Sequence, residues 1–278
     1  MQRTLSPSHL ADFREYLLRQ EKSPATLEKY LRDAGAFAVF ASGKPITKEM
    51  TIAYKQQLAE RGYAVRSINS MLAGLNSLLT FLGWEDCRVK LLRCQKQTYC
   101  REERQLTKGE YLRLLEASRK QEQLNLILQT ICATGIRISE LKYFTVEAVR
   151  SGEVSVRCKS KTRRILVPGK LKRLLLDYAR GRRIHSGGIF LSRLGNPLDR
   201  SNIWASMKKL CAAAGVNPAK VFPHNLRKLF ARTFYQLDRD IAKLADILGH
   251  GSIETTRIYI MTTGTEHRRK LERLGLVV

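Results

Sequence analysis

Five side chains in the second half of the chain have the types and order that attack on a phosphodiester would need. Tyr259 carries a phenol, Arg137 and Arg227 carry guanidiniums, and His224 and His250 carry imidazoles. A phenol is a candidate nucleophile, a guanidinium can bind two phosphate oxygens at once, and imidazoles move protons or donate hydrogen bonds. Together they predict phosphodiester cleavage that needs no metal ion and no other cofactor.

The expected roles follow from acid–base chemistry. A tyrosine hydroxyl has an ordinary pKa near 10, so it needs a base, and His224 is the candidate. His250 is expected to donate a hydrogen bond to the phosphate. Arg137 and Arg227 would offset the negative charge that grows on the non-bridging oxygens as the bond to phosphorus forms.

Two of these residues also have a structural explanation that the sequence leaves open. Arg137 lies three residues before Glu140, a spacing that suits an ion pair on one helical face. Tyr259 lies between two isoleucines and would be a buried core residue if it stood alone. Its position nine residues after His250, in the run Leu-Gly-His, favours the catalytic interpretation.

The net charge narrows the class of partner. Lys and Arg total 50 against 25 Asp and Glu, a formal net charge of +25 in 278 residues. A field of this sign attracts polyanions, so nucleic acid is the expected partner. Residues 1–96 hold 15 basic against 9 acidic side chains, a net +6, which leaves +19 for the remainder. Both parts of the chain are therefore expected to touch DNA.

No membrane or export signal is evident. The chain has no run of about 18 apolar residues, and its N-terminus has no apolar segment of the secretory type. The six cysteines are scattered without CxxC pairs, which argues against a zinc site and against a disulfide framework. We expect a cytoplasmic, nucleoid-associated protein with no membrane partner.

The predicted elements divide the chain into two mainly helical parts. Residues 1–87 predict four short amphipathic helices, and the first two begin at Ser-Pro pairs. Residues 88–105 lose this periodicity and are typical of an exposed linker. Residues 106–278 open with a capping box at Thr107 and predict further helices around one β-hairpin, with strands near 154–158 and 163–167.

The motifs resemble those of the tyrosine recombinases, the phage-integrase type of site-specific DNA recombinase. Residues 133–141 read ATGIRISEL, residues 223–231 read PHNLRKLFA, and residues 248–250 read LGH ahead of Tyr259. A His-x-x-Arg pair alone would be weak evidence for this family, because it arises by chance in many helices. The order and spacing of all the motifs together are specific to the family. The resemblance covers essentially the whole chain and implies an N-terminal four-helix core-binding (SAM-like) domain followed by a catalytic domain.

The resemblance also implies a 3′-phosphotyrosine intermediate at Tyr259 and a hairpin lysine that protonates the leaving 5′ oxygen. We prefer Lys159 to Lys161, because Lys159 ends the first strand on its polar face. The family's usual hairpin has a glycine in the turn and basic residues three positions apart, whereas this turn has no glycine and its lysines are two apart. A plain phosphate contact stays open for either lysine.

The last segment, 263–278, is expected from the resemblance to dock on a neighbouring protomer of a homotetramer that pairs two double-stranded DNA sites. Packing on its own domain is the alternative. Two other functions remain open from sequence: a type IB topoisomerase-like enzyme, and a DNA-binding regulator with an inactive fold. Product topology on one-site and two-site substrates separates the first from a recombinase, and covalent trapping of DNA separates the second.

Overall fold

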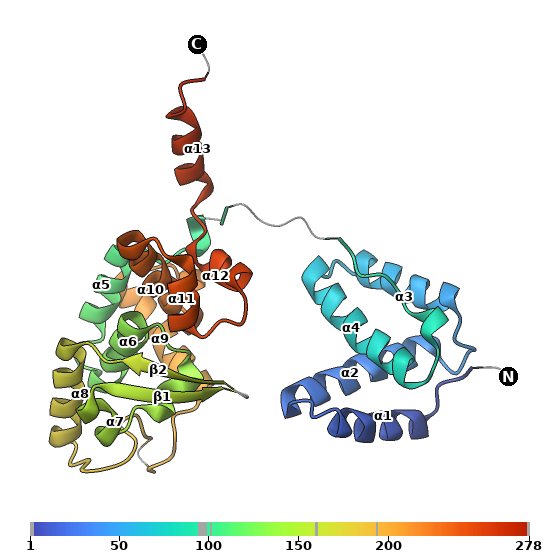
Figure 1. Cartoon of the computed structure of the whole chain (residues 1–278), viewed down its shortest axis with the longest axis horizontal. Helices are drawn as coiled ribbons and strands as arrows, with labels where there is room; N and C mark the ends of the chain where they lie inside the picture. The colour runs from blue at the N-terminus through green and yellow to red at the C-terminus, as the bar shows by residue number, and fades with distance from the viewer. Residues whose placement is uncertain (1–2, 94–98, 101, 159–160, 193, 277–278) are drawn as a thin grey trace. The chain divides into compact units, whose positions relative to one another are not determined.

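The chain folds into two compact units, residues 1–96 and 97–278 (Figure 1). The computed structural model describes residues 3–93, 99–100, 102–158, 161–192 and 194–276. Each unit has its own apolar core.

The first unit is a bundle of four helices, which confirms the fold predicted for this part. The helices are α1 (Pro7–Arg19), α2 (Pro24–Ala41), α3 (Lys48–Glu60) and α4 (Val65–Phe81). The hydroxyls of Ser6 and Ser23 accept backbone N–H groups at the starts of α1 and α2, as the Ser-Pro pairs predict. The core includes Phe37 of α2 and Leu75 of α4, both 0% exposed.

The chain after the short helix η1 (Glu85–Cys87) packs back onto this bundle. Side-chain amides of Asn69 and Asn76 exchange hydrogen bonds of 2.8–3.0 Å with the backbones of Leu92 and Val89, and Val89 is 5% exposed. The sequence predicts an exposed linker from residue 88. The first residues of that stretch instead belong to the first unit, because the two asparagines satisfy their backbone groups.

The second unit is built around α6 (Glu122–Thr134), which packs against α10 (Pro223–Asp238). Leu128 and Ile131 of α6 are 0% exposed, as their helical spacing predicts. The other elements are η2 (Glu102–Arg104), α5 (Lys108–Ala117), η3 (Ile138–Tyr143), α7 (Val146–Ser151), β1 (Glu153–Cys158), β2 (Lys161–Leu166), α8 (Gly169–Gly181), α9 (Arg200–Ala214), η4 (Pro218–Lys220), α11 (Ile241–Leu248), α12 (Ile253–Ile260) and α13 (Gly264–Glu272).

The strands β1 and β2 form an antiparallel pair beside these helices (Figure 1). Val154 and Val156 are buried, which confirms the predicted alternation along β1. Strand β2 begins at Lys161, two residues earlier than predicted. Residues 159–160 lie outside the described part of the chain, so the structure gives no position for Lys159.

Two features of the second unit are absent from the sequence prediction. Helix α8 buries Leu171, Leu175 and Tyr178, whose helical spacing is a signal that the prediction passed over. The end of the expected linker also belongs to this unit, because the Cys100 N–H donates to the Thr262 carbonyl at 2.9 Å. No described helix is both long and apolar enough to cross a membrane.

Candidate active site

Tyr259 and the two histidines meet in the second unit. The Tyr259 hydroxyl lies 3.3 Å from Nδ1 of His224, and their ring centroids are 4.8 Å apart. The His250 ring lies edge-on to the Tyr259 ring, with centroids 4.6 Å apart. Tyr259 is 7% exposed, so the tyrosine is buried and is also in hydrogen-bonding range of a histidine. The core and catalytic interpretations of its sequence position are therefore compatible.

Local helix geometry brings these residues together. His224 and Arg227 lie three residues apart near the start of α10, which places them on one face of the helix. Gly249, with φ +63°, ends α11 in the left-handed conformation and turns the chain so that His250 follows. Gly135 ends α6 in the same way, and a Cβ there would lie 2.3 Å from the Phe230 ring.

Arg227 is 1% exposed and ties three segments together. Its guanidinium donates to the Gly135 carbonyl and, at 2.5 Å, to the Leu248 carbonyl. The carbon of the guanidinium lies 5.8 Å from the centre of the Tyr259 ring. Burial, followed by the nearby charge of Arg137, lowers the pKa of Arg227 to about 10, so it remains a cation at neutral pH.

The hydrogen bonds of His250 define its tautomer. Arg227 can only donate, so Nε2 of His250, 3.1 Å from the guanidinium, accepts. Nδ1 therefore carries the proton and donates to the Thr256 hydroxyl at 2.9 Å. Burial, and then the charges of Arg227 and Arg137, lower the pKa of His250 to about 4, consistent with a neutral ring. The donor expected to face a phosphate is thus engaged with Thr256 in this structure.

Arg137 shares a carboxylate with a second arginine. Its Nη1 donates to Oε1 of Glu140 at 3.0 Å, and its backbone N–H donates to Oε2 at 2.7 Å. Arg163 on β2 donates to the same two oxygens at 3.0 and 2.7 Å. Burial would raise the pKa of Glu140, but the hydrogen bonds from Arg163 and Arg137 hold it below its usual value. The ion pair considered as the structural explanation for Arg137 is therefore present.

Arg163 is the residue of this cluster that the sequence prediction missed. It lies opposite Val156 in the β-ladder and two residues before buried Ile165, so its side chain is on the inner face of the hairpin. A basic residue on the buried face of an alternating strand needs a partner, and that pattern was readable from the sequence. Its partner, Glu140, is 3% exposed.

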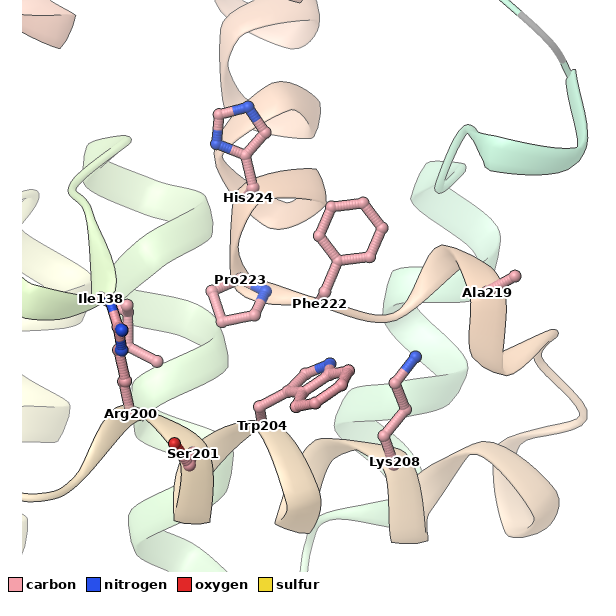
Figure 2. Close-up of a pocket in the computed structure, with 9 residues that line it drawn as sticks. All are labelled: Ile138, Arg200, Ser201, Trp204, Lys208, Ala219, Phe222, Pro223 and His224. Carbon is pink, nitrogen blue, oxygen red and sulfur yellow. The ribbon is translucent and has the colours of Figure 1, made fainter. Parts of the chain in front are cut away.

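A pocket of about 600 Å³ opens beside His224 (Figure 2). Figure 2 shows Trp204 and Lys208 projecting from α9 towards Phe222 and Pro223 at the start of α10. Lys208 lies over the Trp204 ring, 5.4 Å from its centre, and Arg200 lines the same pocket. The pocket therefore combines apolar side chains with two cationic ones, Lys208 and Arg200.

His224 is held neutral by its surroundings. Part of the His224 surface is exposed, but partial desolvation of its ring, followed by the charges of Lys228, Arg227 and Arg137, lowers its pKa to about 4. A neutral ring can accept the proton of the Tyr259 hydroxyl at Nδ1, and the 3.3 Å separation is compatible with that transfer. Among the described residues no cluster of three or more His, Cys, Asp or Glu side chains has the arrangement of a metal site.

Known proteins share both units. The phage integrase family model matches residues 104–265, and the model of the phage integrase N-terminal SAM-like domain matches residues 10–86. Tyrosine recombinase XerA of Pyrococcus furiosus is 30% identical over 284 residues, covering 99% of this chain and 97% of that protein. Tyrosine recombinase XerD of Halalkalibacterium halodurans is 29% identical, covering 87% of this chain and 86% of that protein.

Solved structures agree on the fold. A lambda integrase dimer bound to a COC′ core site superposes with a TM-score of 0.75 at 20% identity, covering 94% of this chain and 96% of that one. A XerA recombinase crystal structure, 25% identical, gives a TM-score of 0.55 and covers 98% of this chain and 99% of that one. The chain belongs to the phage integrase family. It is a tyrosine recombinase, an enzyme of site-specific DNA recombination that breaks and rejoins DNA.

Proposed function

We propose that Tyr259 attacks the scissile phosphodiester and forms a 3′-phosphotyrosine intermediate, without a metal ion. The observation that carries this proposal is the 3.3 Å approach of the Tyr259 hydroxyl to Nδ1 of His224, close to buried Arg227. In this step an O–P bond forms to Tyr259 and the bond from phosphorus to the 5′ oxygen breaks. Because the covalent link retains the bond energy, a different 5′ end can be joined later without ATP.

The charge of the cluster supports a phosphate as the natural occupant. Arg137, Arg163 and Arg227 contribute three positive charges, and Glu140 contributes one negative charge. An anion that enters would find surplus positive charge in a partly buried setting, where electrostatic interactions are stronger than in water. Arg137, whose side chain is 35% exposed, is the arginine that a phosphate reaches first.

The guanidinium of Arg227 is covered by other groups of the site. Its guanidinium is buried beneath the Tyr259 ring and is bonded to two carbonyls and to His250. Contact between Arg227 and a phosphate therefore requires the Tyr259 ring to move aside. For His250 to donate to the phosphate, its Nδ1–H would have to leave the Thr256 hydroxyl. DNA binding would in this way assemble the site.

The two protons of the reaction have separate carriers in this proposal. His224 accepts the proton of the Tyr259 hydroxyl, because its Nδ1 lies within hydrogen-bonding range of that hydroxyl. The leaving 5′ oxygen takes a proton from a lysine of the hairpin turn, with Lys159 preferred to Lys161. Lys159 is outside the described residues, so this assignment rests on the family resemblance.

The assembly we propose is a homotetramer on two double-stranded sites, with residues 1–87 as the core-binding domain. The residues of α13 are all exposed or half-buried, and beyond it Leu274 and Leu276 are 59% and 82% exposed. Exposed leucines on an otherwise charged segment fit docking on a neighbouring protomer. A lambda integrase tetramer bound to a Holliday junction is among the similar structures, with a TM-score of 0.73. Because the substrate is DNA, we place the enzyme at the nucleoid.

The test requires a DNA site, which is first selected by binding from a pool of duplexes with randomised inverted repeats. A nick placed near the cleavage position lets a short fragment diffuse away and traps the covalent complex. We expect a protein–DNA adduct on a denaturing gel in the presence of EDTA, and none with Tyr259→Phe. An adduct that persists in Tyr259→Phe would mean that another residue is the nucleophile. With the wild-type enzyme, we also expect substrates that carry two sites to give recombinant products, whereas a topoisomerase would give only relaxed circles.

A further inference from the structure

We propose that Arg163 is a positioning residue for the cleavage reaction: through Glu140 it fixes the guanidinium of Arg137 in the orientation that binds the scissile phosphate. The inference rests on the proposed function, since it assigns Arg163 a role in the same step. Arg163 comes from β2 and Arg137 from the residue before η3, so the contact joins the hairpin to the phosphate site.

The contact has the geometry of a fixed ion pair. Two nitrogens of Arg163 donate to the two oxygens of Glu140 at 3.0 and 2.7 Å, a bidentate arrangement. The side chains of Arg163 and Glu140 are 13% and 4% exposed. Water therefore screens this pair little, and its planar geometry leaves the carboxylate one orientation.

That orientation determines where Arg137 points. Oε1 of Glu140 accepts from Nη1 of Arg137 at 3.0 Å, and Oε2 accepts from the Arg137 backbone at 2.7 Å. The side chain of Arg137 is 35% exposed, so Glu140 supplies most of what holds it in place. Without Arg163 the carboxylate can rotate, and Arg137 would sample orientations that no longer face a phosphate.

Gly249 closes the arrangement on the other side. Its carbonyl accepts from Nη2 of Arg137 at 3.4 Å. A Cβ at Gly249 would lie 2.6 Å from Nη1 of Arg163, so the Arg163 guanidinium packs directly against this glycine. Arg163 therefore contacts both residues that hold Arg137, namely Glu140 and Gly249. Gly249 is also the residue that precedes His250 in the chain.

The test compares Arg163→Met with Arg164→Met. Arg164 is the next residue on β2, its side chain is 79% exposed, and its nearest carboxylate, on Glu153, is 3.8 Å away. Each variant removes one positive charge from the same strand, so both should weaken DNA binding equally. The rate of adduct formation on the nicked selected site should fall about 10–100-fold in Arg163→Met, the range for groups that orient ligands in metal sites. It should change by less than about threefold in Arg164→Met.

A sulfur-substituted substrate separates Arg137 from the hairpin lysine. When the leaving 5′ oxygen is replaced by sulfur, the P–S bond breaks to give a thiolate, which needs no proton from a general acid. A defect that comes from misplaced Arg137 should persist on this substrate, because phosphate binding is unchanged by the sulfur. If the sulfur restores Arg163→Met to the wild-type rate, Arg163 serves the lysine and the proposal is wrong.

Arg163→Lys keeps the inference testable if Arg163→Met unfolds. A lysine retains the charge but cannot bridge both carboxylate oxygens, so we expect a loss of roughly 3–10-fold on both substrates, with an unchanged melting temperature. A wild-type cleavage rate in Arg163→Lys would by itself overturn the positioning role, because a lysine cannot make the bidentate contact with Glu140. If wild-type protein gives no Tyr259-dependent adduct, the proposed function has failed instead, and the two failures are distinct.

Discussion

The two arginines that we propose bind the phosphate should differ in what they contribute to folding. Arg227 is 1% exposed and donates to the buried carbonyls of Gly135 and Leu248, joining α6 and α11 to α10. Arg137 is partly exposed, and its partner Glu140 keeps Arg163 when Arg137 is removed. Arg227→Ala should therefore be far less stable than Arg137→Ala.

The magnitude follows from the hydrogen bonds that each substitution removes. A hydrogen bond from a charged donor contributes about 1.5–3 kcal/mol, so the two carbonyls of Arg227 account for about 3–6 kcal/mol. Removing a buried guanidinium also removes its own desolvation cost, which leaves a net loss of about 2–4 kcal/mol. Arg137→Ala should cost about 1 kcal/mol or less, as for a partly exposed ion pair.

Calorimetry and cleavage assays on Arg227→Ala and Arg137→Ala test these expected differences in stability and in activity. Arg227→Ala should melt about 5–15 °C below wild type, and Arg137→Ala within about 4 °C of it. Below both melting temperatures, each should cleave the selected site about 10²–10³-fold more slowly while binding it almost normally, since many other basic residues hold DNA. Equal melting temperatures for the two variants would refute the stabilising role of Arg227, and a fall in affinity equal to the fall in cleavage would make either arginine a plain DNA anchor.

Three further predictions concern pH, salt and assembly. The free energy of unfolding should decrease as the pH falls from about 6.5 to about 4, because unfolded histidines gain protons that His224 and His250, with pKa values of about 4 in the folded protein, do not. Urea titrations should show a flatter profile when both histidines are replaced by glutamine. The logarithm of the DNA association constant should fall with the logarithm of the salt concentration at a slope of roughly −7, as expected for about 8 phosphate contacts. A slope shallower than about −3 would contradict DNA binding by both domains. Serine at the exposed Leu271, Leu274 and Leu276 should leave single-site binding intact and abolish pairing of two sites on native gels; normal pairing would show that the segment does not exchange.

The sequence predicted the parts of the site that local rules determine. Helix α10 begins at Pro223 and places His224 and Arg227 on one face, so that pair follows from spacing alone. The buried face of β1 follows from the alternation of Val154 and Val156. The family resemblance then identified which tyrosine, among ten, belongs with these residues.

The contacts between distant segments were beyond local rules. The bidentate pair of Arg163 with Glu140 joins residues 23 positions apart and depends on how the hairpin packs against η3. The tautomer of His250 depends on Arg227 and Thr256 together. The return of residues 88–92 onto the first unit depends on two asparagines of α4, because the stretch itself has no periodic pattern.

The central claim is that the Tyr259 oxygen becomes bonded to phosphorus. The most direct measurement is to digest the trapped adduct with protease and nuclease and to locate the nucleotide-bearing residue by mass spectrometry. We expect a 3′-linked nucleotide on Tyr259 in the peptide that covers α12. A nucleotide on any other residue, or no covalent nucleotide while the DNA is cut, would contradict it.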